Sequence, residues 1–460
     1  MRAELLDRPL REQAAAIGSG EADPAELLEA TLARIEERNP AINAIVETFP
    51  DRSREMLAGA PPGPLRGVPV AIKDEWPLPW RAERWGAARP PAGAKPAESG
   101  PYRALRDAGA VIVGVANMHE YGAGSTGGIS VYGPVHNPWD TERCAGGSSS
   151  GSAAAVAARL VSGAVGADGI GSIRYPAAYC GLTGLKPTFG RSAMEGHRLA
   201  TATRTIVSGP LCRDAGDCRL LGSVLFGEPL AASEATGPRI GIVPGELWED
   251  CTPDVRGACE DAVATLREES DGTLGELRRD GLEHVLIASI LLGQTEDLAS
   301  ISPAGLSAFG EEVSLVARAL LRYRLLIPAA VIARAQRVRT MVRRSLARAF
   351  EDFDLLAWPT SPAVAPPLDN PTVELPSGSH TADWANPRHG GIANLAGIPG
   401  ISVPVGLDAD GLPIALQLLA AWGRDELLLD AAEALERANG RRFVEATPPL
   451  AAAGTAPAPS

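Results

Sequence analysis

The sequence predicts a single large α/β domain in which helices and strands pack in layers. Short apolar runs of strand length alternate with longer helical patterns along the whole chain, which is typical of an α/β fold. The sequence contains no internal repeat and no flexible linker. We therefore expect one domain, although the length of 460 residues alone would suggest about three.

The first predicted element is a helical region over residues 3–47. Asp23 followed by Pro24 is typical of a helix start, because aspartate caps free N–H groups and proline fits the first helical position. Asn39 followed by Pro40 is expected to end this helix. Between these points the apolar stripe consists of Leu27, Leu28, Leu32 and Ile35.

Further strands and helices follow in alternation. Strands are predicted from short runs rich in Val, Ile and Leu at residues 67–72, 111–114, 163–166, 240–243, 355–360, 400–405 and 414–418. Helices are predicted at residues 102–109, 152–160, 212–226 and 252–268, over most of 289–353, and at 426–438. Residues 76–100 are rich in Pro, Trp and Gly without a period and are expected to form a loop.

Charge and composition exclude several classes of protein. The formal net charge of −13 argues against a nucleic-acid partner, which needs a concentrated positive surface. The arginines of residues 334–344 have the spacing of a solvated helix face. There is no signal peptide and no run of about 18 apolar residues, so we expect a cytoplasmic protein that does not enter a membrane. The six cysteines show no metal spacing and are expected to be reduced thiols, mostly in the core.

Two blocks rich in glycine and serine are the most informative feature. Residues 146–151 read G-G-S-S-S-G and residues 168–172 read D-G-I-G-S, which places Ser148 and Ser172 where the backbone can expose its N–H groups. Upstream, Lys73 directly follows a short apolar strand. One lysine and two serines can together perform the chemistry that Ser-His-Asp performs in other hydrolases.

Three other interpretations of these blocks are weaker. Residues 147–151 match the nucleophile elbow G-x-S-x-G with Ser149 as nucleophile, but residues 141–145 make a poor preceding strand and no downstream histidine has a matching context. Residues 181–188 read G-L-T-G-L-K-P-T, in which a proline interrupts the ending of a phosphate-binding loop. Loop filler would explain one block, but not two blocks and a lysine at the end of a strand.

Eight segments carry a resemblance to a known family. They are G-V-P-V-A-I-K-D (67–74), N-M-H-E (117–120), Y-G-P-V-H-N-P-W-D (132–140), G-G-S-S-S-G-S-A-A-A-V-A-A (146–158), D-G-I-G-S-I-R-Y-P-A-A (168–178), C-G-L-T-G-L-K-P-T-F-G-R (180–191), N-L-A-G-I-P-G-I-S-V-P-V-G (394–406) and G-L-P-I-A-L-Q-L-L (411–419). On these segments the chain resembles the amidase signature family of serine hydrolases over nearly its whole length. The resemblance implies a central mixed, twisted β-sheet covered by helices on both faces.

The resemblance also implies the site residues. Ser172 matches the family's nucleophile, Ser148 matches the serine at a cis peptide bond that relays protons, and Lys73 matches the general base. Gly122 and Ser149 are expected to line the substrate pocket, and Gly122 leaves more room than the larger side chains that the family often has there. The family's oxyanion hole of main-chain N–H groups maps onto Gly169, Ile170, Gly171 and Ser172.

The proposed chemistry requires these residue types. A serine hydroxyl is a poor nucleophile until a base takes its proton. Lysine can be that base only when neutral, and burial favours the neutral amine. Ser148 would pass the proton from Ser172 to Lys73 and return it to the leaving amine. Each oxyanion donor is worth about 3 kcal/mol of transition-state stabilisation. Ile170 replaces a glycine that is common in the family, but its N–H can still serve.

Several neighbours of these residues are expected to be structural. Asp168 and Arg174 flank the second serine and are expected to form a buried pair that holds the loop, and Asp74 is expected to have a similar role. His119 and Glu120 are expected to begin a helix near the pocket wall. Loop packing, rather than a pocket wall, is the expected role of Trp76, Trp80, Trp85 and Tyr121.

The resemblance implies an amidase that hydrolyses a small carboxylic amide to an acid and ammonia or an amine, without a metal or organic cofactor. The alternative in the same family is the glutaminase subunit of a tRNA-dependent amidotransferase. Such subunits tend to carry an aspartate before N-L-A-G, and residues 386–391 contain none, so we favour the stand-alone hydrolase. A scaffold protein without catalysis is a third alternative, against which the intact lysine and serines argue. Homodimers are common in the family, which makes a second copy of the chain a candidate partner.

The elements and the resemblance together predict how the chain is divided. Residues 1–60 are expected to form an N-terminal helical segment packed on the core. Residues 61–445 are expected to form the amidase catalytic domain, with a variable helical segment at about 270–353. Residues 446–460 are rich in Pro, Ala, Gly and Thr and are expected to be a disordered tail, because they cannot bury enough apolar surface to become ordered.

Overall fold

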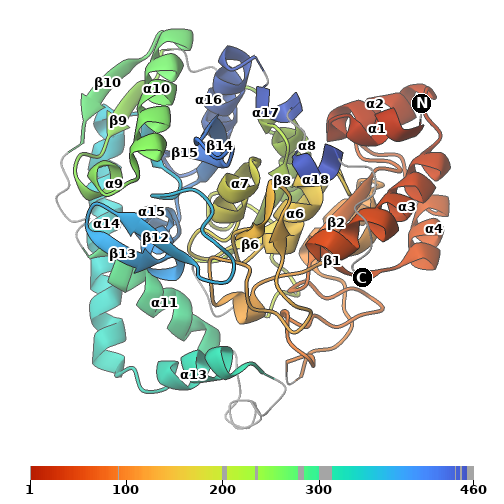
Figure 1. Cartoon of the computed structure of the whole chain (residues 1–460), viewed down its shortest axis with the longest axis horizontal. Coiled ribbons are helices and arrows are strands. Elements are labelled where there is room, and N and C mark those ends of the chain that lie inside the picture. The colour runs from red at the N-terminus through yellow and green to blue at the C-terminus, as the bar shows by residue number, and fades with distance from the viewer. Residues whose placement is uncertain are drawn as a thin grey trace.

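The centre of the molecule is a mixed β-sheet of 11 strands (Figure 1). In spatial order the strands are β1 (Ile45–Thr48), β3 (Val111–Ala116), β2 (Pro69–Lys73), β6 (Gly163–Asp168), β8 (Val207–Cys212), β7 (Thr183–Lys186), β14 (Gly400–Leu407), β15 (Pro413–Ala420), β11 (Leu355–Pro359), β9 (Arg239–Ile242) and β10 (Thr273–Glu276). Two hairpins lie outside the sheet, β4 (His136–Asn137) with β5 (Asp140–Cys144) and β12 (Thr372–Leu375) with β13 (Gly378–Thr381).

The computed structural model describes most of the chain, namely residues 2–91, 93–198, 205–233, 237–277, 284–299, 313–440, 442–445 and 448–452. Part of the helical prediction for 289–353 and most of the predicted tail lie outside these residues. None of the described helices combines the length and the apolar content that a membrane crossing requires.

The strand directions explain why the functional segments meet. β2 runs parallel to β3 and to β6, whereas β8, β7, β14, β15 and β11 continue the sheet in antiparallel pairs. Because parallel strands end at the same edge of a sheet, Lys73 at the end of β2 emerges beside the loop that follows Asp168 at the end of β6. All positions of β2, β3 and β6 are buried, which accounts for their largely apolar sequences, with a charged residue only at the last position of β2 and of β6.

Helices cover both faces of the sheet, as the sequence predicts (Figure 1). α8 (Ala215–Phe226), α10 (Pro253–Glu269) and α16 (Asp425–Ala438) pack in a row on one face, and α6 (Ser150–Ala157), α7 (Arg174–Cys180) and α15 (Ala382–Ala396) pack on the other. The remaining helices are α1 (Arg2–Asp7), α2 (Leu10–Ser19), α3 (Pro24–Ile42), α4 (Pro50–Ala58), α5 (Gly100–Asp107), α9 (Glu246–Glu249), α11 (Val285–Ala299), α13 (Leu315–Arg324), α14 (Ala329–Asp352), α17 (Arg442–Glu445), α18 (Pro449–Ala452) and the short 3-10 helix η1 (Glu120–Gly122).

The N-terminal region matches only in part the helical region predicted for residues 3–47. Residues 3–47 form three helices and then β1, whose residues pair with β3 at the edge of the sheet. Asp23 does cap α3, accepting a hydrogen bond from the Ala25 N–H at 2.8 Å. The predicted end at Pro40 is wrong, because a proline in the last turn removes only one helical hydrogen bond. The helix continues to Ile42 and ends where Asn43 adopts a left-handed conformation.

Two other expectations are corrected. Residues 141–145, judged a poor strand, largely belong to β5, which is stabilised by pairing with β4 rather than by an apolar sequence. Pro449–Ala452 forms the short helix α18 in the segment expected to be disordered, with Leu450 packed against the core. The division of the chain near residues 60 and 445 stays a prediction.

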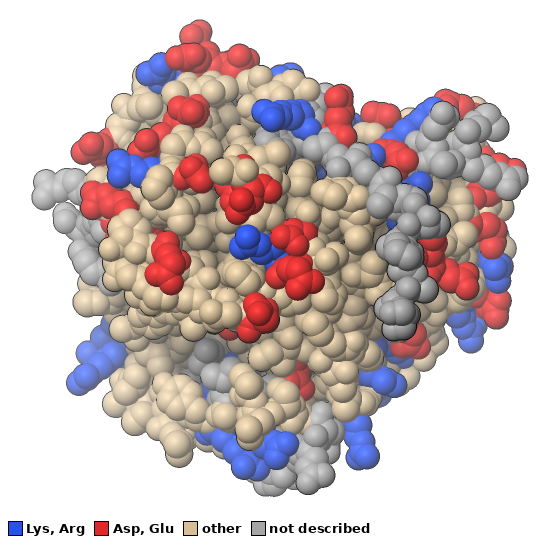
Figure 2. Space-filling view, viewed as in Figure 1, with Lys and Arg blue, Asp and Glu red and all other residues tan. Residues whose placement is uncertain are grey.

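Charged side chains follow the sequence pattern in most places. Acidic side chains are spread over most of the face in Figure 2, and arginines gather at its lower edge near α13. The arginines of residues 334–344 lie on α14, and most of them are exposed, as predicted. Arg339 is the exception, since it is buried and its Nε donates to the Leu395 carbonyl oxygen at 2.9 Å.

The six cysteines are buried and unpaired, which agrees with the expectation of free thiols.

A partly buried carboxylate of α16 gives a testable pH dependence of stability. Glu436 accepts hydrogen bonds from Thr183 Oγ1 at 2.8 Å and from the Ala215 N–H at 2.9 Å. Burial, with the nearby charge of Asp214, raises its pKa from 4.5 to about 8. Between about pH 4.5 and 8 the native state therefore binds more protons than the unfolded state, so this group's contribution to stability falls as the pH rises through that range.

We expect Glu436→Gln to match the wild-type free energy of unfolding at pH 5 and to exceed it by on the order of 2 kcal/mol at pH 8. Urea unfolding at the two pH values measures this. Glu374→Gln, which changes an exposed glutamate on β12, is the control and should show no such difference. Equal stability of Glu436→Gln and the wild type at pH 8 would contradict the prediction.

Candidate active site

Lys73 and Ser148 form a hydrogen bond in the wall of a cavity that lies at the carboxyl ends of β2 and β6. The Lys73 side chain is 1% exposed, and its Nζ donates to Ser148 Oγ at 2.9 Å. Ser148 follows a cis peptide bond from Gly147, just before α6 begins at Ser150. Both side chains are buried, so the contact lies out of bulk water.

Ser172 lies in the loop between β6 and α7, which a buried ion pair holds in place. Asp168 accepts hydrogen bonds from the Gly171 N–H at 2.6 Å, from the Ile173 N–H at 3.2 Å and from Arg174 Nε at 3.0 Å. Asn394 of α15 adds a further bond to Asp168 Oδ1 at 2.9 Å. The predicted structural pair of Asp168 and Arg174 is thus confirmed.

The guanidinium of Arg174 connects this loop to distant segments. It bonds to Gln417 on β15, to the Gly390 carbonyl oxygen at 3.1 Å and to Asn394 Oδ1 at 2.5 Å. Burial alone would raise the pKa of the Asp168 carboxyl, but the charge and hydrogen bonds of Arg174 hold it at about 2. The carboxylate therefore stays ionised and keeps its hydrogen bonds over the whole neutral range.

Tyr175 packs under the same loop and requires glycine at two positions. Its hydroxyl lies 2.6 Å from the Ile170 carbonyl oxygen and 2.8 Å from the Asn386 carbonyl oxygen, and its single proton is shared between these two acceptors. A Cβ at Gly171, where φ is +118°, would lie 2.1 Å from Tyr175 Cζ, and a Cβ at Gly390 would lie 2.1 Å from the Tyr175 hydroxyl. The ring and the loop backbone thus fit only when both positions lack a side chain.

We expect Gly171→Ala to lower the free energy of unfolding by about 1–3 kcal/mol and to reduce activity, because the Tyr175 ring or the loop must move. Urea unfolding measures the first effect. Gly190→Ala is the matched control, since Gly190 also has a positive φ of +86° but no atom within 4 Å of an added Cβ. If the two variants lose the same stability, backbone conformation rather than the contact with Tyr175 explains the loss.

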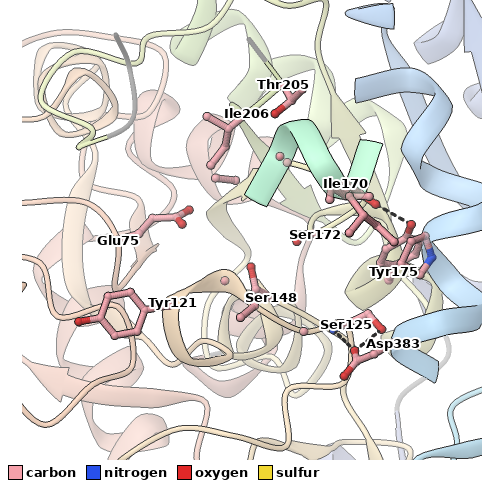
Figure 3. A pocket seen from close by; sticks show the side chains of 18 of the residues that line it. Glu75, Tyr121, Ser125, Ser148, Ile170, Ser172, Tyr175, Thr205, Ile206 and Asp383 are labelled. Atoms are coloured by element: carbon pink, nitrogen blue, oxygen red, sulfur yellow. Dashed lines mark hydrogen bonds between the residues drawn. The ribbon is translucent and has the colours of Figure 1, made fainter. Parts of the chain in front are cut away.

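The cavity has a volume of about 140 Å³. The predicted residues that line it are Lys73, Gly122, Ser148, Gly169, Ile170 and Ser172. In Figure 3, the Ser148 and Ser172 side chains face the same space, and Glu75 faces it from the opposite side. A Cβ at Gly122 would lie 3.5 Å from Ser148 Oγ, so glycine at this position leaves room beside the serine.

Two predicted site residues have other partners. Ser149 does not line the cavity, because its hydroxyl is turned to the end of β6, where it donates to the Ala167 carbonyl oxygen at 3.1 Å. The Ser149 hydroxyl is thus directed away from the cavity, and its contact with substrate stays a prediction. The N–H of Gly171 is bonded to Asp168 and is not free for an oxyanion. Within the described part of the chain, the N–H groups of Gly169, Ile170 and Ser172 have no acceptor.

The aromatic residues of the 76–100 loop, together with Tyr121, either line the cavity or pack within the loop. Trp85 and Tyr121 line the cavity, although loop packing was expected for both. Trp80 packs edge-on against Phe49 and Tyr102 and is a loop anchor, as expected. Asp74 is structural as predicted, since Arg81 lies 2.7 Å from its carboxylate. Glu120 begins η1 beside the cavity, which agrees with the short helix expected there.

Sequence reasoning missed three charged residues of the cavity. Glu75, Arg324 and Asp383 all line it. Arg324 ends α13, in a segment without any of the family's motifs. Asp383 lies in the first turn of α15, just before residues 386–391, which contain no aspartate. Asp383 accepts hydrogen bonds from the N–H of Ser125 at 2.5 Å and from its Oγ at 2.8 Å. The signal for Glu75 was its place two residues after Lys73.

The charges around Lys73 oppose one another. Burial lowers the pKa of the Lys73 amine, whereas the carboxylates of Glu75 and Asp168 raise it, and burial prevails. For Glu75, burial would raise the pKa, but the ammonium of Lys73 and the imidazole of His197 hold it below its ordinary value. A lysine with a lowered pKa is the form that can accept a proton near neutral pH.

Comparisons with known proteins agree with this arrangement. A family model described as Amidase matches residues 26–429. A glutamyl-tRNA(Gln) amidotransferase subunit from Methylococcus capsulatus is 31% identical over 94% of this chain and 97% of its own length. A crystal structure of an amidase has a TM-score of 0.87 and 31% identity, covering 94% of this chain and 99% of its own. The 6-aminohexanoate cyclic dimer hydrolase has a TM-score of 0.85 and 26% identity, covering 97% of this chain and 99% of its own.

The match to the family model extends over most of the chain and contains Lys73, Ser148 and Ser172. The TM-score of 0.87 over 94% of this chain shows that it shares its overall fold with the solved amidase. On these grounds the chain belongs to the amidase signature family.

Proposed function

We propose that this protein cleaves the C–N bond of a carboxylic amide through an ester formed on Ser172. The observation that carries the proposal is the 2.9 Å hydrogen bond between Lys73 Nζ and Ser148 Oγ, at the back of the cavity that Ser172 also lines. A buried amine bonded to one serine, at a cavity that a second serine also lines, is a route for moving a proton out of the nucleophile.

The first half of the reaction forms the acyl-enzyme. Ser172 Oγ attacks the amide carbonyl carbon while its proton passes to Ser148 Oγ and the Ser148 proton passes to Lys73 Nζ. The C–N bond then breaks, and the proton returns from Lys73 through Ser148 to the leaving nitrogen. In the second half a water molecule follows the same route, its proton moving to Lys73 and then to Ser172 Oγ as the acid leaves.

The oxyanion formed in each half needs hydrogen-bond donors beside Ser172. The N–H groups of Gly169, Ile170 and Ser172 are the donors available in this loop, and each is worth about 3 kcal/mol when well placed. Gly171 contributes in a different way. Its bond to Asp168 turns the backbone so that the neighbouring N–H groups are left for the substrate.

Two substrate classes remain within this chemistry. The stand-alone hydrolase, favoured on sequence grounds, is supported by the amidase structure and the cyclic dimer hydrolase described above. The glutaminase subunit is supported by curated relatives such as the Methylococcus capsulatus protein, and these relatives favour it over the stand-alone hydrolase. Free glutamine carries an ammonium and a carboxylate. In the cavity wall, Asp383 supplies a negative charge to match the ammonium and Arg324 a positive charge to match the carboxylate.

The test is the release of ammonia or amine from glutamine, asparagine, aliphatic amides and aryl amides by the purified chain. Ser148→Ala, which removes the proposed relay, should lose the activity of the wild type on every substrate. If glutamine is the best substrate, Asp383→Asn and Arg324→Met should raise its KM more than that of an uncharged amide. Preference for uncharged amides would favour the stand-alone hydrolase. No hydrolysis of any amide or ester would contradict the proposed function.

A further inference from the structure

The carboxylate of Glu75 faces the amine of Lys73, which the proposed mechanism uses as its base. Glu75 lies in the turn after β2, and both its side chain and that of Lys73 are 1% exposed. Glu75 Oε1 lies 3.1 Å from Lys73 Nζ. The same nitrogen also donates a hydrogen bond to Ser148 Oγ. The amine is thus held between one carboxylate and the serine that passes protons to it.

On its other side, the Glu75 carboxylate faces His197, which packs between two tryptophan rings. His197, in the segment between β7 and β8, places its Nε2 3.9 Å from Glu75 Oε2. The imidazole packs against Trp76 at 4.6 Å and against Trp85 at 5.3 Å between ring centroids, and it is buried. Because these rings restrict the imidazole, the carboxylate it contacts has little freedom to turn away from Lys73.

A carboxylate in this position changes what the lysine can do. A buried amine without a counter-ion resists protonation and is a weak base. The proposed reaction requires Lys73 to become an ammonium each time it takes the serine proton. An anion at 3.1 Å stabilises that ammonium at the moment it forms.

We propose that Glu75 is a positioning residue of the Lys73, Ser148 and Ser172 set, holding the Lys73 amine beside Ser148 and stabilising the ammonium that forms there. This inference rests on the proposed function, in which Lys73 is the base. Glu75 touches the base and acts through it. It does not become a proton donor or acceptor for the substrate.

The pH at which Lys73 titrates also depends on the other charged groups that face it. Asp168 at the end of β6 acts on Lys73 through its charge, whereas the pKa of His119 ahead of η1 is lowered by burial and by the charge of Lys73. Further titratable groups on the cavity wall are Tyr121, Tyr175, Arg324 and Asp383. None of these groups forms an ion pair with Lys73 among the described residues, whereas Glu75 does, so Glu75 should have the largest single effect.

A lysine titration tests the inference without any substrate. Lys73, Lys95 and Lys186 are the only lysines in the sequence, so protein carrying lysine labelled with 13C at the ε carbon gives one signal for each. Lys73→Ala identifies the Lys73 signal. We expect Glu75→Gln, which keeps the shape and removes the charge, to lower the titration midpoint of Lys73 by about one to three pH units.

The same variants are then compared in kcat/KM against pH on the best amide. Because Lys73 must be neutral to act, its lower midpoint in Glu75→Gln should move the acidic limb of the profile to lower pH by the same amount and reduce the maximal rate. Glu83→Gln is the matched control: Glu83 is buried in the same loop but does not line the cavity. It should leave the Lys73 midpoint and the limb where they are in the wild type.

The outcomes separate this inference from the proposed function. A wild type that hydrolyses amides, with a Lys73 midpoint that is unchanged or raised in Glu75→Gln, overturns the role of Glu75 alone. A wild type without hydrolysis overturns the proposed function, while the titration still decides whether Glu75 controls Lys73. If Glu75→Gln does not fold, Glu75→Asp carries the test. It should give a smaller shift in the same direction, and an unshifted midpoint would overturn the inference.

Discussion

Ser172→Ala is expected to abolish amide hydrolysis, with a loss of at least about 10⁴-fold in kcat/KM, because it removes the oxygen that attacks the amide carbonyl carbon. The methyl group cannot form the ester through which the acyl group passes to water. Binding should survive, since Ser172 is only partly buried and the residues around the cavity are unchanged. Initial rates of ammonia or amine release on the best amide measure the loss.

The control for this prediction is Ser152→Ala on α6. Ser152 is buried and donates to the Val165 carbonyl oxygen at 3.1 Å, outside the cavity. It should retain most of the wild-type kcat/KM, with at most a loss of stability. If Ser172→Ala keeps activity within tenfold of the wild type, the nucleophile lies elsewhere and the proposed mechanism is wrong.

Asp168→Asn is expected to have the largest effect on stability, about 3–5 kcal/mol, because it leaves the Arg174 charge buried without its counter-ion. Both side chains are 0% exposed. The variant also removes the charge that holds the Gly171 and Ile173 N–H groups, so the loop bearing Ser172 should lose its shape. Urea unfolding gives the stability, and activity measured well below the unfolding transition gives the effect on the loop.

A surface pair provides the matched control for Asp168→Asn. Asp354 pairs with Arg239 at 3.0 Å, but the two side chains are 34% and 46% exposed. Asp354→Asn should therefore change the free energy of unfolding by less than about 1 kcal/mol. Equal effects of the two variants would mean that burial of the Asp168–Arg174 pair has no special importance.

The same pair predicts how the protein responds to acid. The pKa of Asp168 is about 2 in the folded state, against an ordinary value of 3.8. Its stabilising contribution is therefore complete above about pH 4 and is lost as the pH falls through about 2. Asp168→Asn should remove this part of the acid dependence.

The sheet and the serine loops were predictable because their signals are local. Strands such as β2 and β6 are buried along their whole length, so each appears in the sequence as an apolar run that a charged residue ends. The glycines around Ser148 and Ser172 mark backbone that other residues cannot adopt, and Gly146 and Gly171 do have positive φ. Both signals can be read without knowing the neighbours in space.

The residues that were missed depend on contacts between distant segments. β1 pairs with β3, and although Ile45, Val46 and Thr48 favour strands, a run of four residues after a helical pattern is too short to be recognised as a strand on its own. Arg324 and Asp383 reach the cavity only through the packing of α13 and α15 around it. Ser149, the residue just before α6, turns its hydroxyl to β6 rather than to the cavity, which depends on a contact between two segments that are 18 residues apart.

The most direct test of the central claim is the mass of the acylated protein. Wild type is mixed with a p-nitrophenyl ester, quenched in acid within the first turnover, and digested for peptide mass spectrometry. The proposed mechanism predicts one acyl group per chain, attached to Ser172, and none on that peptide in Ser172→Ala. An acyl group on a different residue, or product formation without any acylated peptide, would contradict it.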